Sequence, residues 1–104
     1  MTSMELAAKM AEAYKEYRRA YSEMVMAEAN RSVVHYSVLG ALRSAYEGAG
    51  QKVTESKLDA ESKCSIELVG AIAHHGKCIV ACGDAEAAYM LAKAAYTASL
   101  TPPQ

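Results

Sequence analysis

The chain of 104 residues has no Phe and no Trp, and its two Pro residues are adjacent at positions 102 and 103. Large apolar contacts must therefore come mainly from seven Tyr and six Met. Proline interrupts helices, and none occurs before residue 102, so two long stretches of helix-forming residues remain uninterrupted. They are separated by a glycine-marked segment, 48–54. The sequence predicts an all-α protein.

The chain also lacks an excess of charge of either sign. Eleven Lys and Arg stand against twelve Asp and Glu, and the signs are interleaved, which provides no footprint for nucleic acid or anionic lipid. The longest apolar region, 66–82, contains Glu67 and Lys77, which argues against a membrane span. The first residues lack the apolar stretch of a signal peptide, and three Cys do not form a disulfide framework. We expect a cytoplasmic protein.

The predicted organisation is a single domain, 1–104, with a helix over about 4–47, a loop over 48–54 and a helix over about 55–99. The proline pair is expected to end the second helix. A weak point lies at Gly83-Asp84, where this helix either continues or breaks and restarts. A short loop between long helices predicts an antiparallel hairpin, in which residue i lies opposite roughly 103 − i.

Assembly of several copies into a helical bundle is the next expectation. Apolar residues make up 52% of the chain, but many are alanines that bury little surface. The stretches 33–42 and 65–82 are apolar on almost every face of the helix. A hairpin covers only one face of each helix. Gly70, Gly76 and Gly83 would permit close helix approach. The fold class is therefore an antiparallel hairpin assembled into an oligomeric bundle.

Charged and polar residues interrupt the apolar stripe of the first helix at Glu28, Arg31 and His35. The hairpin register sets Glu28 opposite His75 and Arg31 near His74. Buried charges are costly unless they are paired, so one interpretation is a polar layer that fixes register and copy number. The other is a pocket between helices or subunits, in which Arg31 binds a phosphate-bearing ligand through two hydrogen bonds.

A row of tyrosines on the first helix has the spacing of one helix face, with Arg18 beside it. The row is either part of the core or a surface on which a base stacks while Arg18 meets the phosphate. The full set of predicted ligand-binding residues is Arg31, Glu28, His35, His74, His75, Arg18, Tyr17 and Tyr21.

A metal site is an alternative, because His74, Cys78 and Cys82 recur every four residues and share one helix face. Histidine with thiolates suits Cu(I) or Zn(II), and the spacing resembles that of small helical copper-handling proteins, which have more cysteines. Catalysis has less support. No acid is placed to orient a Cys78–His74 pair, and neither a phosphate-binding glycine loop nor a carboxylate pair is evident. We therefore predict a protein without enzymatic activity or cofactor.

Three stretches resemble small helical accessory proteins of tailed phages: the Ala-Tyr-Glu-rich AEAYKEYRRAY, the turn GAGQKVTE and the restart ESKLDAE. The resemblance implies a protein of the host cytoplasm that counters host defence. Those with a role either bind a defence protein or sequester a nucleotide signal in pockets between subunits, and sequestration is our leading hypothesis. Alternatively the chain is a protein–protein inhibitor or adaptor acting on a host defence or phage recombination complex. The implied partners are other copies of the chain and a small anionic ligand or a host protein.

Overall fold

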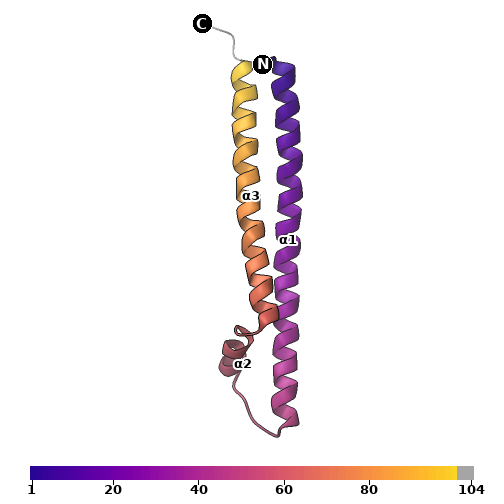
Figure 1. Cartoon of the computed structure of the whole chain (residues 1–104), viewed down its shortest axis with the longest axis vertical. Helices are drawn as coiled ribbons and strands as arrows, with labels where there is room; N and C mark the ends of the chain where they lie inside the picture. The colour runs from indigo at the N-terminus through magenta and orange to yellow at the C-terminus, as the bar shows by residue number, and fades with distance from the viewer. Residues whose placement is uncertain (101–104) are drawn as a thin grey trace. The chain divides into compact units, whose positions relative to one another are not determined.

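The computed structural model describes residues 1–100, which form three α-helices and no strand: α1 (Ser3–Gly48), α2 (Glu55–Ser62) and α3 (Ile66–Ser99) (Figure 1). The all-α prediction is confirmed. The proline pair expected to end the second helix lies outside the described residues. None of the described helices combines the length and apolar character needed to cross a membrane.

Both ends of α1 are closed by local hydrogen bonds. At its start the Thr2 hydroxyl oxygen accepts the Glu5 N–H at 3.1 Å, and the hydroxyl donates to the Glu5 carboxylate at the same distance. At its end Gly50 takes a φ of +70° and the Gln51 N–H reaches back to the Tyr46 carbonyl at 2.9 Å. This is a Schellman motif, which favours glycine at the left-handed position.

The second half of the chain breaks at 63–65, which corrects the prediction of one helix over about 55–99 with a weak point at Gly83-Asp84. The Ser62 hydroxyl donates to the Asp59 carbonyl at 2.7 Å, and the Ser65 N–H donates to the Ser62 carbonyl at 3.0 Å. Such local bonds compete with helix continuation. Helix α3 runs without interruption through Gly83, where one glycine costs propensity but removes no backbone hydrogen bond.

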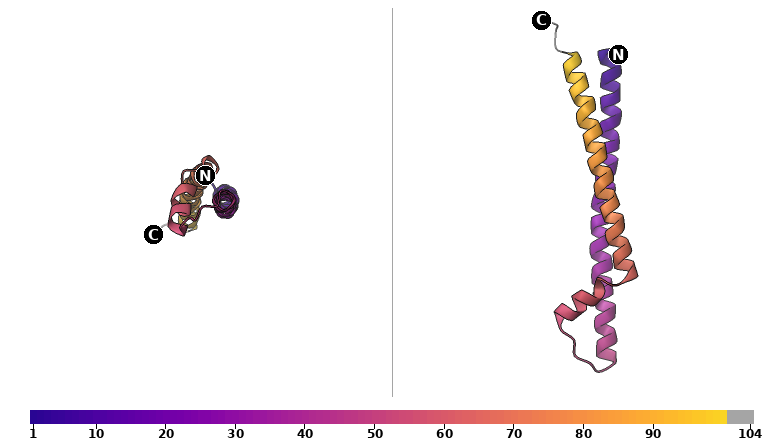
Figure 2. Two further views of the ribbon diagram at one scale, coloured as in Figure 1. Left: turned by 90° about the horizontal axis from the view of Figure 1, so that it is seen from below. Right: turned by 60° about the vertical axis from the view of Figure 1, so that its left-hand side comes forward.

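The chain divides into two compact units. The terminal unit joins Met1–Met24 to Cys78–Gln104, and its segments of α1 and α3 run side by side in opposite directions (Figures 1 and 2). The Ser3 hydroxyl donates to the Ser99 hydroxyl at 3.0 Å, and the Tyr14 and Tyr89 ring centroids are 5.2 Å apart. The hairpin and the oligomeric bundle of the whole chain stay predictions.

The central unit, Val25–Lys77, contains the second part of α1, all of α2 and the beginning of α3. Helix α2 lies at an angle to α1 and buries Leu58 (Figure 2). Across the described residues, the buried apolar side chains are small apart from two leucines: Ala20, Ala27, Leu58, Leu68, Ala71, Cys78 and Cys82. Much of the larger apolar surface therefore remains exposed.

Candidate functional site

The contact between Arg31 and His75 lies in the central unit and joins α1 to α3. The Arg31 guanidinium Nη1 is 3.4 Å from Nδ1 of His75, whose side chain is buried. The sequence register placed Glu28 opposite His75, and this is corrected, because Arg31 makes that contact and Glu28 is exposed. The physical reason is a shift of one helical turn relative to the predicted register, which brings residue 31 to residue 75.

Guanidinium is only a donor, so a hydrogen bond across this contact needs Nδ1 of His75 as the acceptor. The ion pairs of the described residues involve Arg19, Arg43, Lys63 and His35, and none includes Arg31. The Arg31 charge is therefore not neutralised by a carboxylate in the part of the chain that the structure describes.

His35 lies one turn beyond Arg31 on α1 and meets α2. Its Nε2 atom is 3.4 Å from Oδ1 of Asp59, an ion-pair distance without hydrogen-bond geometry, and this buried nitrogen has no hydrogen-bond partner among the described residues. Asp59 is also paired with Lys63 at 3.0 Å. The Lys63 ammonium, and secondarily His35, hold the pKa of the Asp59 carboxyl below its ordinary value.

The remaining predicted ligand residues are distributed over both units. His74 is exposed on α3, one position before the buried His75. Tyr17, Arg18 and Tyr21 belong to the terminal unit, whereas Arg31 and His75 belong to the central one. Arg18 is exposed. No single unit therefore unites the whole predicted set.

The tyrosine row is divided between packing and solvent. The Tyr17 ring packs against Tyr89 with centroids 6.1 Å apart, and the nearby Glu86 carboxylate raises the pKa of the Tyr17 hydroxyl. The side chains of Tyr14 and Tyr21 are 46% and 47% exposed, so neither ring lies wholly in the core. Ala20 occupies the buried position instead, because a small residue permits closer contact between the helices.

The metal alternative is not supported by the structure. His74, Cys78 and Cys82 share a repeat of four in the sequence, but Cys78 and Cys82 are buried in the helix contact and His74 is exposed. Among residues 1–100, no group of three His, Cys, Asp or Glu side chains is placed to hold a metal ion. Residues 74 and 82 share a helix face but lie about 12 Å apart along its axis, which is too far for both to bind one metal ion.

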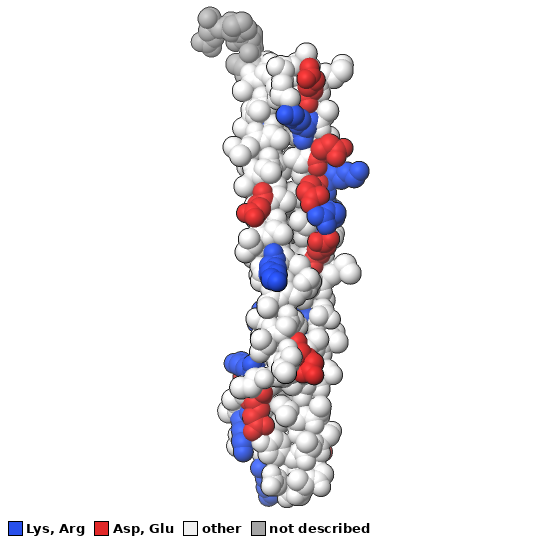
Figure 3. Space-filling view, in the orientation of Figure 1, with Lys and Arg blue, Asp and Glu red and all other residues white. Residues whose placement is uncertain are grey.

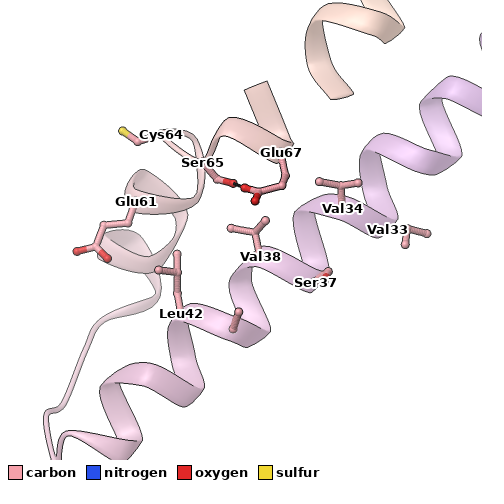
Figure 4. Close-up of a pocket in the computed structure, with 10 residues that line it drawn as sticks. Val33, Val34, Ser37, Val38, Leu42, Glu61, Cys64, Ser65 and Glu67 are labelled. Atoms are coloured by element: carbon pink, nitrogen blue, oxygen red, sulfur yellow. Dashed lines mark hydrogen bonds between the residues drawn. The ribbon is translucent and has the colours of Figure 1, made fainter. Parts of the chain in front are cut away.

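An apolar groove in the central unit was not predicted from the sequence. It encloses about 610 Å³ between α1 and the corner that joins α2 to α3 (Figure 4). Val34 and Val38 point from α1 toward Ser65 and Glu67. The sequence feature that could have indicated the groove is the absence of Lys, Arg, Asp and Glu over 32–42. The lining residues are Val33, Val34, Ser37, Val38, Ala41, Leu42, Glu61, Cys64, Ser65 and Glu67.

The rim of this groove is acidic, and both of its carboxylates are already engaged. The Ser65 hydroxyl donates to Glu67 at 2.6 Å and holds the pKa of that carboxyl below its ordinary range. The Tyr46 hydroxyl donates to Glu61, which raises the pKa of Tyr46. An anion would meet repulsion here, so the groove suits an apolar group and the cationic Arg31–His75 contact suits an anion.

Charge on the visible surface is mixed rather than patterned. Along the terminal part of α1, basic and acidic side chains alternate, whereas charged side chains are sparse over α3 (Figure 3). Arg19 pairs with both Glu16 and Glu23, as neighbouring turns of one helix allow.

No protein-family model, curated protein or solved structure matches the chain. We therefore infer function from the contacts between the described residues.

Proposed function

We propose that the protein is a non-catalytic binding protein that holds a small anionic ligand at Arg31 and acts as a homo-oligomer. The observation that carries the proposal is the Arg31 guanidinium, which contacts the buried His75 ring at 3.4 Å and enters none of the ion pairs of the described residues. A guanidinium retains its charge at every physiological pH, so a charge without a carboxylate partner is available to an external anion.

The ligand chemistry follows from the geometry of the two groups. One Arg31 N–H is directed to His75, and the other donors remain for two parallel hydrogen bonds to a phosphate group. A nucleotide is the ligand class that we favour. Tyr17 packs on Tyr89 rather than standing free for a base, so the phosphate is the anchored part in this proposal.

Oligomerisation is supported by the amount of exposed apolar surface. Fifteen large apolar side chains of the described residues are each more than 40% exposed. Large side chains on the outer helix faces, such as Val80, Met26 and Leu91, are 63–74% exposed. Coverage by further copies would remove this surface from water.

Titration calorimetry with inorganic phosphate and a panel of cyclic and linear nucleotides tests the proposal. We expect binding to the native protein, and its loss in Arg31→Met, which keeps the aliphatic length of the side chain and removes the charge. Arg43→Met is the matched control, because Arg43 is an exposed α1 arginine already paired with Glu55. Equal binding by the two variants, or none by the native protein, would exclude an anion site at Arg31.

A second candidate function is a protein–protein inhibitor or adaptor. It is favoured by the rings of Tyr14 and Tyr21, which lie on either side of Arg18 along α1 and are each nearly half exposed. Tyrosine and arginine are frequent anchors of protein interfaces. Capture of a specific host protein by the native chain, lost in Tyr14→Ala/Tyr21→Ala and kept in Tyr36→Ala, would support it.

The biological setting in this proposal comes from the resemblance to small phage proteins. A phage-encoded binder of this kind would remove a host nucleotide signal in the cytoplasm and so evade immunity. A detected preference for a signalling dinucleotide over ATP and inorganic phosphate would support this setting. Equal affinity for all phosphates would favour a general anion site instead.

A further inference from the structure

Helix α3 presents an uncharged face to solvent, opposite its buried side. Buried residues of α3 such as Ala71, Cys78 and Cys82 follow spacings of three and four. A second set of α3 residues has the same spacings of three and four. It is offset from the buried set by two positions, which turns it by about 200° around the helix axis. All of its members are exposed, and they are Val69, Ala73, Gly76, Val80, Gly83, Ala87, Met90 and Ala94. We call this set the outer face of α3.

We propose that the outer face of α3 packs against the outer face of α3 in a second copy of the chain, with the two helices antiparallel. This inference names the contact behind the oligomer of the proposed function, and to that extent rests on it. Spacings of three and four are those of residues that interlock between helices. In the register where large residues best face small ones, Val80 of one copy lies against Gly83 of the other.

The sizes of the facing residues support this register. With Val80 opposite Gly83, Met90 meets Ala73 of the second copy, and Val69 meets Ala94. Each of these layers joins a large residue to a small one, and the symmetry of the pair repeats every layer on both sides. The large members are between 52% and 63% exposed in the single chain, so the contact removes substantial apolar surface from water.

The glycines fit the same arrangement. A Cβ built on Gly76 or Gly83 meets no atom within 4 Å, and neither residue has a positive φ, so the single chain does not require glycine there. Both lie at the centre of the proposed contact, Gly76 beside Ala87 of the second copy. Glycine at these positions lets two helices approach closely, which a larger residue would prevent.

Charge determines the direction of the helices. Lys77 and Asp84 are exposed and flank the outer face on one side, two turns apart. In the antiparallel register Lys77 of each copy lies opposite Asp84 of the other, which makes two symmetric ion pairs. In a parallel pair the two different flanks would meet, which places Lys77 and Asp84 beside isoleucines of the second copy and makes no ion pair. On the other flank Glu86 and Lys93 lie beside isoleucines, so no like charges meet.

Sedimentation equilibrium of Gly83→Leu tests the contact. The open space around Gly83 accommodates the side chain within one copy, but between copies leucine would meet Val80. We expect the dissociation constant to rise about tenfold or more, as overpacking of a close contact does. Gly40→Leu is the control, because Gly40 is also an exposed mid-helix glycine with no atom within 4 Å of an added Cβ. Circular dichroism checks that both variants keep the helix content of the native chain.

Charge reversal provides a second, independent test. Lys77→Glu and Asp84→Lys should each weaken association, and the double variant should restore it, because it recreates opposite charges in every pair. Association of Gly83→Leu and of both single variants at the native constant would overturn the α3 contact, as would a native chain that stays monomeric. Phosphate and nucleotide titration of the same variants separates this failure from that of the anion site, which would be lost in Arg31→Met whatever the copy number.

Discussion

Nη1 of Arg31 lies 3.4 Å from Nδ1 of His75, so a permanent cation in α1 is directed at a buried imidazole in α3. Such a pair contributes little to stability by itself, since a hydrogen bond exchanged with water yields a small net gain. Its cost is the desolvation of the imidazole. The contact therefore adds little to the stability of the fold.

The first prediction concerns His75→Leu, which replaces a buried imidazole with an apolar side chain of similar volume. Because Arg31 is exposed and can turn to water, we expect the free energy of unfolding to change by less than about 1 kcal/mol. Urea unfolding at constant protein concentration measures this change. A loss well beyond that range would show that the pair is a structural layer, as the first interpretation of the sequence held.

The second prediction concerns Tyr89, whose ring contacts both Tyr14 and Tyr17 in the terminal unit. Tyr89→Ala removes both ring contacts, and because the residue is only half-buried we expect a loss of about 2 kcal/mol, less than for a fully buried ring. Tyr89→Phe should retain most of the stability. Tyr36→Ala is the control, since that side chain is 73% exposed and its removal should cost no more than about 0.5 kcal/mol.

The helices could be predicted because their signals are local. The absence of proline and the glycines near residue 50 delimit α1, and the Gly50 conformation confirms why glycine stands there. The break at 63–65 was missed because it depends on the Ser62 side chain, which bonds to the Asp59 carbonyl, and on the Ser65 backbone N–H, which bonds to the Ser62 carbonyl. By contrast Gly83, where the sequence indicated a weak point, lies within a continuous helix.

The candidate site was predicted only in part, because residue choice on a helix face is more ambiguous than helix position. Alanine and tyrosine both suit a helix contact, and the sequence does not show that Ala20 is buried while Tyr21 is half-exposed. The spacing of Arg31 and His75 placed both residues on the helix contact. Their pairing with each other was not predicted, because the helices are shifted by one turn relative to the predicted register. The groove beside Val38 depends on where α2 lies, which no local pattern specifies.

The third prediction concerns the Asp59 carboxyl, whose pKa is held below its ordinary value of 3.8 by Lys63 first and by His35 second. A carboxyl with a depressed folded-state pKa stabilises the fold above its unfolded-state pKa, and this contribution disappears as the pH falls through the depressed value. In Lys63→Gln we expect the Asp59 pKa to rise toward 3.8. Carboxyl carbon chemical shifts followed by NMR against pH measure it.

Lys52→Gln is the control for this measurement, since Lys52 lies in the loop before α2 and takes part in none of the ion pairs of residues 1–100. It should leave the Asp59 titration unchanged. His35→Gln should produce a smaller rise than Lys63→Gln, in the order of the two causes. The reverse order would mean that the contact with α1 dominates, contrary to the structure.

The last prediction contrasts two glycines in which the same substitution should act in opposite directions. Gly40 lies inside α1 with helical backbone and open space around it, so Gly40→Ala should raise the free energy of unfolding by about 0.5–1 kcal/mol. Gly50 has a φ of +70°, which costs an alanine about 1 kcal/mol, so Gly50→Ala should lower it by that amount. Urea unfolding of both variants at one protein concentration measures the pair. A stabilising Gly50→Ala would show that α1 does not end in the left-handed turn, and a destabilising Gly40→Ala would place a neighbour against that face of α1.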